Sequence, residues 1–130
     1  RAQASGSALR PVNPPPRGVT PLMRWLLVEV LKRPRPDLLD QLEVLLDRLD
    51  VLESQLPRVP GLEEISACFL EAGAHYRQAA WELALQLNQR VPGRWARAAR
   101  QARQGAALLE QADALNFRLR ARLEPPAPLA

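Results

Sequence analysis

Apolar residues recur along this chain at the three- and four-residue spacing of amphipathic helices, and prolines separate the segments that carry this pattern. The pattern predicts four helices. The first is short, with Thr20 as its N-cap, Pro21 at the first helical position and an end near Arg33. The others are expected over residues 37–56, 62–89 and 94–123.

The second predicted helix is the most regular. Its leucines recur every three or four residues and form one stripe: Leu38, Leu42, Leu45, Leu49, Leu52 and Leu56. Its acids lie away from that stripe: Asp37, Asp40, Glu43, Asp47, Asp50 and Glu53. One face of this helix should therefore pack against the core while the opposite face contacts solvent.

The third and fourth helices have matched lengths and are joined by a short turn at Val91-Pro92-Gly93, which predicts an antiparallel hairpin. Residues whose numbers sum to roughly 183 should then be neighbours across the hairpin. One stripe, Leu62, Ile65, Phe69, Ala72, Tyr76, Ala79 and Leu83, should face another, Trp95, Ala98, Ala102, Gly105, Leu109, Ala112 and Leu119. Many of these residues are small, so the two backbones should approach closely.

A second apolar stripe runs along the opposite side of the third helix, through Leu70, Ala74, Trp81 and Leu85. A helix with two apolar sides either occupies the centre of its bundle or is shared with another subunit. Two interpretations follow for Leu70, Trp81 and Leu85. They are core residues beneath the first or second helix, or they are anchors at an oligomer or partner interface.

These patterns predict an all-α fold, an antiparallel bundle of about four helices in which two long hairpin helices pack with two shorter ones. Residues 1–20 are expected to be a flexible, basic, Pro-rich arm, 21–124 a single helical-bundle domain, and 125–130 a second Pro-rich tail. The tetrapeptide Arg58-Val59-Pro60-Gly61 recurs at 90–93, and ten of 32 positions match at this offset. A helix duplication, or two Ala/Leu helices packed in phase, would each produce such matches.

Composition excludes two classes of protein, disulfide scaffolds and proteins with a membrane-spanning apolar run. The 130 residues are 47% hydrophobic and include one cysteine, which excludes a disulfide scaffold, and no apolar run is long enough to span a membrane. The net charge of +4 is a remainder of blocks: +5 over residues 1–34, −4 over 35–56, +1 at Arg58, −2 over 61–90 and +4 over 91–130. Every cation except Lys32 is an arginine.

An arginine ladder, Arg94, Arg97, Arg100 and Arg103, opens the fourth helix and is the main charged candidate for binding. Guanidinium groups suit phosphate or carboxylate partners. Three interpretations remain: pairing inside the fold, an acidic protein partner, or nucleic-acid phosphates contacted without base stacking. For the first, the hairpin register places Glu82 near Arg100 and Arg103, with the acidic second helix covering the rest.

Catalytic and metal chemistry find little support in the sequence. The third helix carries Glu64, Cys68, Glu71 and His75 along one arc, opposite Glu110 and Asp113, but the chain has no second histidine for a helical-bundle metal site. Cys68 and His75 are seven residues apart, about 10 Å along a helix, which is too far for proton transfer. We therefore predict no enzyme, no metal and no cofactor.

The sequence thus predicts a non-catalytic interaction or assembly subunit that docks a protein partner or a second copy through its helix faces. Leu70, Trp81 and Leu85 would be the apolar anchors, and Arg94, Arg97, Arg100 and Arg103 would steer an acidic surface. The alternative is a small helical nucleic-acid-binding subunit using the same arginines. A cytoplasmic location is favoured, although no motif fixes the compartment.

Overall fold

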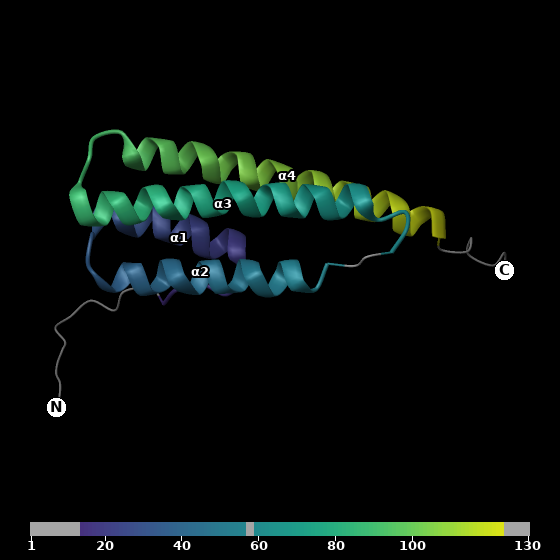
Figure 1. The fold of residues 1–130 in the computed structure, drawn as a ribbon, viewed down its shortest axis with the longest axis horizontal. Coiled ribbons are helices and arrows are strands. Elements are labelled where there is room, and N and C mark those ends of the chain that lie inside the picture. The colour runs from purple at the N-terminus through teal and green to yellow at the C-terminus, as the bar shows by residue number, and fades with distance from the viewer. Residues whose placement is uncertain (1–13, 57–58, 124–130) are drawn as a thin grey trace, which may run out of the picture.

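The computed structural model describes residues 14–56 and 59–123. Four helices cover most of these residues: α1 Val19–Lys32, α2 Asp37–Ser54, α3 Glu63–Gln89 and α4 Arg94–Leu123. The predicted all-α bundle, with two long hairpin helices and two shorter ones, is confirmed, and each observed end lies within two residues of its expected position (Figure 1). The tails expected at 1–20 and 125–130 fall largely outside the described residues.

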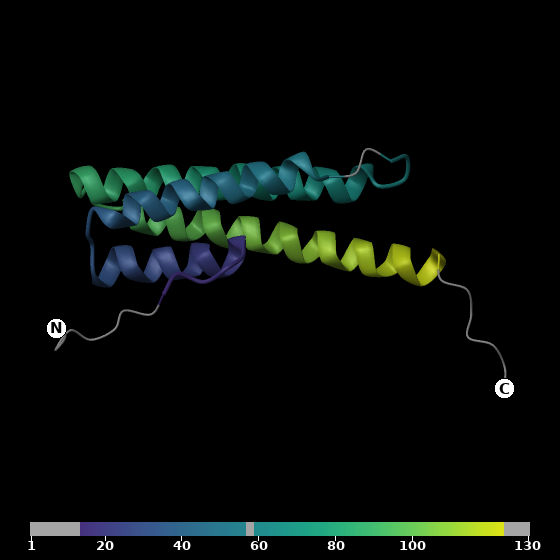
Figure 2. The ribbon, with the colours of Figure 1, turned by 90° about the horizontal axis from the view of Figure 1, so that it is seen from below.

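The helices form two layers, with α2 and α3 in one and α1 and α4 in the other (Figures 1 and 2). The α3–α4 hairpin makes the most extensive contact, and α3 also packs beside α2. Helix α3 therefore occupies a corner of the bundle. This arrangement leaves its outward side without a covering helix among the described residues.

The core lies where all four helices meet. Its largest fully buried side chains are Tyr76, Leu22, Met23, Leu26, Leu38, Leu45 and Leu83. Leu49 is the last buried leucine of the α2 stripe, and Leu52 is about half exposed. Leu52 is exposed because α1 begins only at Val19, which leaves an apolar cleft lined by Leu52, Leu56 and Phe69.

The start of α1 differs from the expectation that Thr20 is the N-cap. Gly18, at a φ of 89°, precedes the first helical residue, Val19. Thr20 lies inside the helix, and its hydroxyl is 3.0 Å from the hydroxyl of Tyr76. A buried tyrosine hydroxyl requires a hydrogen-bonding partner, so this tertiary contact outweighs local capping.

The repeated Val-Pro-Gly segment, Val59–Gly61 and Val91–Gly93, forms the same turn before each long helix. The amide of Leu62 donates to the carbonyl of Val59 at 3.1 Å, and the amide of Arg94 donates to the carbonyl of Val91 at 3.3 Å. In each turn proline is followed by a glycine with positive φ, 96° at Gly61 and 84° at Gly93. Proline and then a positive-φ glycine at the two central positions are typical of a type II turn.

The small residues predicted along the hairpin do bring α3 and α4 close together, but the register differs from the prediction. Observed neighbours are Tyr76 with Gly105 and Glu82 with Arg97, whose numbers sum to 181 and 179. The register of the hairpin is thus displaced by two to four residues, which is up to about one helical turn. The physical reason is visible in Figure 1, where α3 extends beyond the start of α4 and the connecting loop folds back.

Trp95 ties the hairpin to α1. Its indole nitrogen donates a 2.7 Å hydrogen bond to the carbonyl of Leu27, and its ring packs half-buried against the core. The expectation that Trp95 points inward is therefore confirmed.

Candidate docking face

The outward side of α3 carries an apolar stripe, which we call the docking face: Leu70, Ala74, Trp81 and Leu85. Leu70 is 50% exposed and Trp81 is 53% exposed, while Leu85 is half-buried. The interpretation of Leu70 and Trp81 as core beneath α1 or α2 is wrong, because α3 lies at a corner of the bundle and not at its centre. Periodicity separated this stripe from the core stripe, but it carried no signal for which stripe stays uncovered.

The edge of the docking face nearest α4 is built around a buried carboxylate. Glu82 is 2% exposed, and its two oxygens accept hydrogen bonds from Arg94 Nη1 at 2.7 Å and Arg97 Nε at 2.9 Å. The guanidinium of Arg94 also lies over the Trp81 ring, 5.3 Å from its centroid. These contacts fix the orientation of Trp81 beside a charged cluster.

Glu82 pairs inside the fold as predicted, but its observed partners, Arg94 and Arg97, each lie six residues before the expected ones. The expected partners, Arg100 and Arg103, are exposed and have no acidic partner among the described residues. The folded-back loop places Arg94 and Arg97 beside Glu82. The ladder is therefore divided into two internally paired arginines and two exposed ones.

Burial alone raises the pKa of Glu82, but the hydrogen bonds from Arg97 and Arg94 and their positive charges outweigh it, so the pKa is lowered from its ordinary value of 4.5. The carboxylate consequently remains ionised in the fold across the neutral range. The cluster is a fixed structural element on one side of the docking face.

Replacing Glu82 with glutamine, which keeps the shape and removes the charge, should lower the free energy of unfolding at neutral pH by about 1 kcal/mol. The expected loss of stability is modest because the side chain of Arg97 is 47% exposed, so solvent screens its attraction to Glu82. Since folding lowers the pKa of Glu82, its contribution exists above pH 4.5 and disappears as the pH falls through the folded value. Urea unfolding at about pH 7 and about pH 3 measures this; a wild-type advantage that persists undiminished in acid would refute it.

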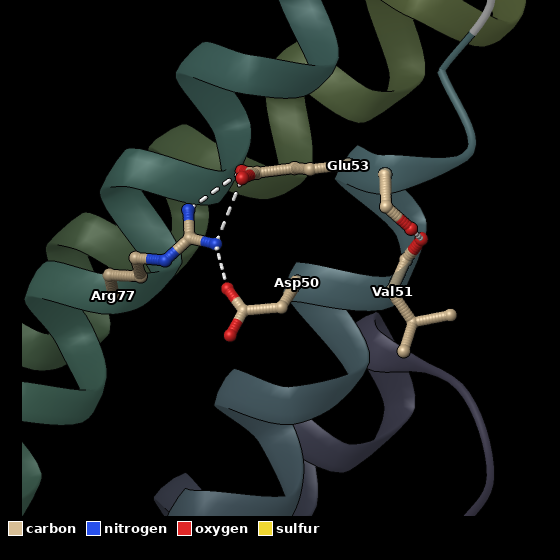
Figure 3. A network of polar contacts seen from close by, with 5 residues as sticks. Asp50, Val51, Glu53 and Arg77 are labelled. Carbon is tan, nitrogen blue, oxygen red and sulfur yellow. Dashed lines mark hydrogen bonds and ion pairs between the residues drawn. The ribbon is translucent and has the colours of Figure 1, made fainter.

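The edge nearest α2 carries a second ion-pair network (Figure 3). Arg77 reaches across from α3 and donates to Glu53 at 2.7 and 3.0 Å and to Asp50 at 2.8 Å. The hydrogen bond to Glu53 is the largest cause of a raised pKa for Arg77 and outweighs the opposing effect of burial. Acids of α2 were expected to cover the arginine ladder, but Asp50 and Glu53 bind Arg77, which sequence reasoning had not identified.

Gly73 explains how α2 approaches α3 at this network. A side chain at this position would place its first carbon against Glu53 Oε2 and Arg77 Nη1. The absence of a side chain therefore leaves space for the Arg77–Glu53 pair. A glycine one turn before an arginine was the only signal of this site in the sequence.

The polar arc of α3 forms no metal site within the described residues, where no three His, Cys, Asp or Glu side chains could hold an ion. Cys68 is buried as a free thiol, and His75 Nδ1 lies 2.7 Å from Gln101 Oε1. In the described part of the chain no helix is both long and apolar enough to cross a membrane. The prediction of a non-enzyme stays a prediction.

Comparisons with protein-family models, with curated proteins and with solved structures found no match for this chain. Function must therefore be inferred from the residues themselves. The docking face and its two charged edges are the features that carry such an inference.

Proposed function

We propose that the chain is a non-catalytic helical assembly subunit that docks through the outward face of α3. The observation that supports this most is the half-exposure of Leu70 and Trp81 on one helix face. Tryptophan is among the side chains most enriched at the energetic centres of protein interfaces. Exposed apolar surface of this kind favours association because covering it removes it from water.

The surrounding charges fit the same role. Glu82 and Arg94 hold the Trp81 ring in place, so little side-chain entropy is lost when a partner covers it. Arg100 and Arg103 are exposed and have no acidic partner among the described residues, so they can steer an acidic surface toward this side of the bundle. The paired arginines thus support the anchor, and the exposed arginines provide long-range attraction.

Phosphate binding by the ladder, the alternative function, has weaker support. Two of its four arginines, Arg94 and Arg97, are bound to Glu82. Contact with a nucleic-acid backbone gains its affinity from the number of phosphates neutralised, so this pairing reduces what the ladder can supply.

Substituting glutamate at both Leu70 and Trp81 tests the proposed function. Charged groups at these positions should weaken the association of the chain with its partner by at least about thirtyfold while leaving the core intact. The mass of the complexes purified from the cells that produce the chain measures this, with circular dichroism as the check on folding. Phe117→Glu is the matched control, because Phe117 is an exposed aromatic residue on another helix, 74% exposed.

Loss of the complexes in the double variant and their retention in Phe117→Glu would support the proposal. Complexes that survive the double variant unchanged would show that the chain docks through another surface. A wild-type chain that is monomeric and without a partner would refute the proposed function altogether.

A further inference from the structure

We propose that the partner of the docking face is a second copy of this chain, in a parallel two-fold dimer whose axis runs along α3. This inference rests on the proposed function and names its partner. It follows from the charges on the two edges of the docking face, which have opposite sign.

The edge formed by α2 is acidic. Glu43 and Asp47 are exposed and have no basic partner among the described residues, whereas Asp50 is held by Arg77. The edge formed by α4 is basic, with the exposed Arg100 beside Arg97, whose side chain is 47% exposed. A surface that is acidic on one side, apolar in the middle and basic on the other can complement a copy of itself.

The orientation of the two-fold axis decides whether the acidic edge of one copy faces the basic edge of the other. A two-fold axis that relates two facing surfaces lies in the interface, either along the helices or across them. An axis across α3 makes the helices antiparallel and places α2 opposite α2 and α4 opposite α4, which opposes like charges. An axis along α3 makes the helices parallel and places α2 of each copy opposite α4 of the other, which opposes unlike charges.

The heights of the charges along the bundle agree with the parallel arrangement. The Asp50–Arg77 pair fixes α2 against α3, and the Arg97–Glu82 pair fixes α4 against α3. Because a helix rises about 1.5 Å per residue, Asp47 lies about 4.5 Å before Asp50 on α2, and Arg100 lies about 4.5 Å after Arg97 on α4. Both helices run antiparallel to α3, so along the bundle axis both charges lie within about one turn of the height of Trp81.

A parallel axis also suits the apolar residues. Each residue on the axis meets its own copy, so Leu70 contacts Leu70 and Trp81 contacts Trp81 of the second chain. Ala74, between them and exposed, is small enough to allow the two helices to approach. The apolar centre is thus flanked on both sides by an acidic and a basic edge.

A charge-exchange experiment with purified chain tests this dimer. Asp47→Arg and Arg100→Glu should each raise the Kd of the dimer about tenfold, because each symmetric dimer contains the reversed contact twice. An equimolar mixture of the two variants should recover the wild-type Kd, since both contacts between them are again of opposite charge. Sedimentation equilibrium measures the Kd values, and Asp113→Arg, far along α4 and exposed, is the control.

A cross-link tests the direction of the helices. In a Cys68→Ala background, Ala74→Cys should form an intermolecular disulfide on mild oxidation if the helices are parallel. Absence of this cross-link, or a dimer that both charge reversals leave unchanged, would overturn the parallel arrangement. A purified chain that stays monomeric would overturn the proposal that the partner is a second copy. In that case, complexes that are isolated from cells and that are lost in the Leu70 and Trp81 variant would still support the proposed function.

Discussion

Alanine in place of Tyr76 is expected to lower the free energy of unfolding by about 4 kcal/mol, because it removes the largest fully buried side chain and leaves a cavity. Tyr76 is 1% exposed and packs in the core shared by the helices, and its ring lies against Gly105 of α4. The ring therefore fills the space that the small residues of α4 create.

Tyr76→Phe separates the contribution of the ring to stability from the contribution of the hydroxyl. Phenylalanine keeps the packing and removes only the hydrogen bond to Thr20, so its cost should be about 1 kcal/mol. Chemical unfolding of both variants beside the wild type measures the two values. Equal losses for Phe and Ala would mean that the hydroxyl, and not the packing of the ring, stabilises this part of the bundle.

Alanine in place of Gly105 should lower the free energy of unfolding by about 2 kcal/mol. Its added carbon would lie 2.7 Å from Cε1 of Tyr76 and 3.2 Å from the carbonyl oxygen of Ala72, which is closer than atoms pack. Separating the helices costs up to about 3 kcal/mol, and the better helix propensity of alanine returns about 1 kcal/mol. The remainder is the expected loss, measured by chemical unfolding.

Gly73→Ala is the matched control, because Gly73 is the other glycine inside a long helix. Its added carbon meets the carboxylate of Glu53 and the guanidinium of Arg77, which are flexible ends of side chains that can shift. The gain in helix propensity and the weakened ion pair should nearly cancel, leaving stability within about 0.5 kcal/mol of wild type. Similar losses at both glycines would contradict the close packing of α3 on α4 around Tyr76.

The helices were predictable because each depends on local spacing. The leucines of α2, the prolines between helices and the Val91-Pro92-Gly93 turn specify elements that form within a few residues of their expected bounds. The close approach of α3 and α4 was predictable from small residues such as Ala72 and Gly105. Both features follow from side-chain size and period, which a sequence displays directly.

The register and the exposed face were not predictable, because they depend on tertiary geometry. The partners of Glu82 lie six residues earlier on α4 than expected, because the loop before α4 folds back along the bundle. The second stripe of α3 is compatible with a core or an interface, and only the corner position of α3 shows that Trp81 stays exposed. The ion pairs of Arg77 were not predictable because its acidic partners lie on another helix, more than twenty residues away in sequence.

The mass of the wild-type chain as it is isolated from its cells, compared with that of the Leu70→Glu, Trp81→Glu double variant, tests the docking face most directly. Docking through α3 predicts native wild-type species heavier than a single chain, whose mass is taken from the same sample under denaturing conditions, and a double variant that returns to that single-chain mass. A native wild-type species of single-chain mass, or heavy species that the double variant retains, would contradict it.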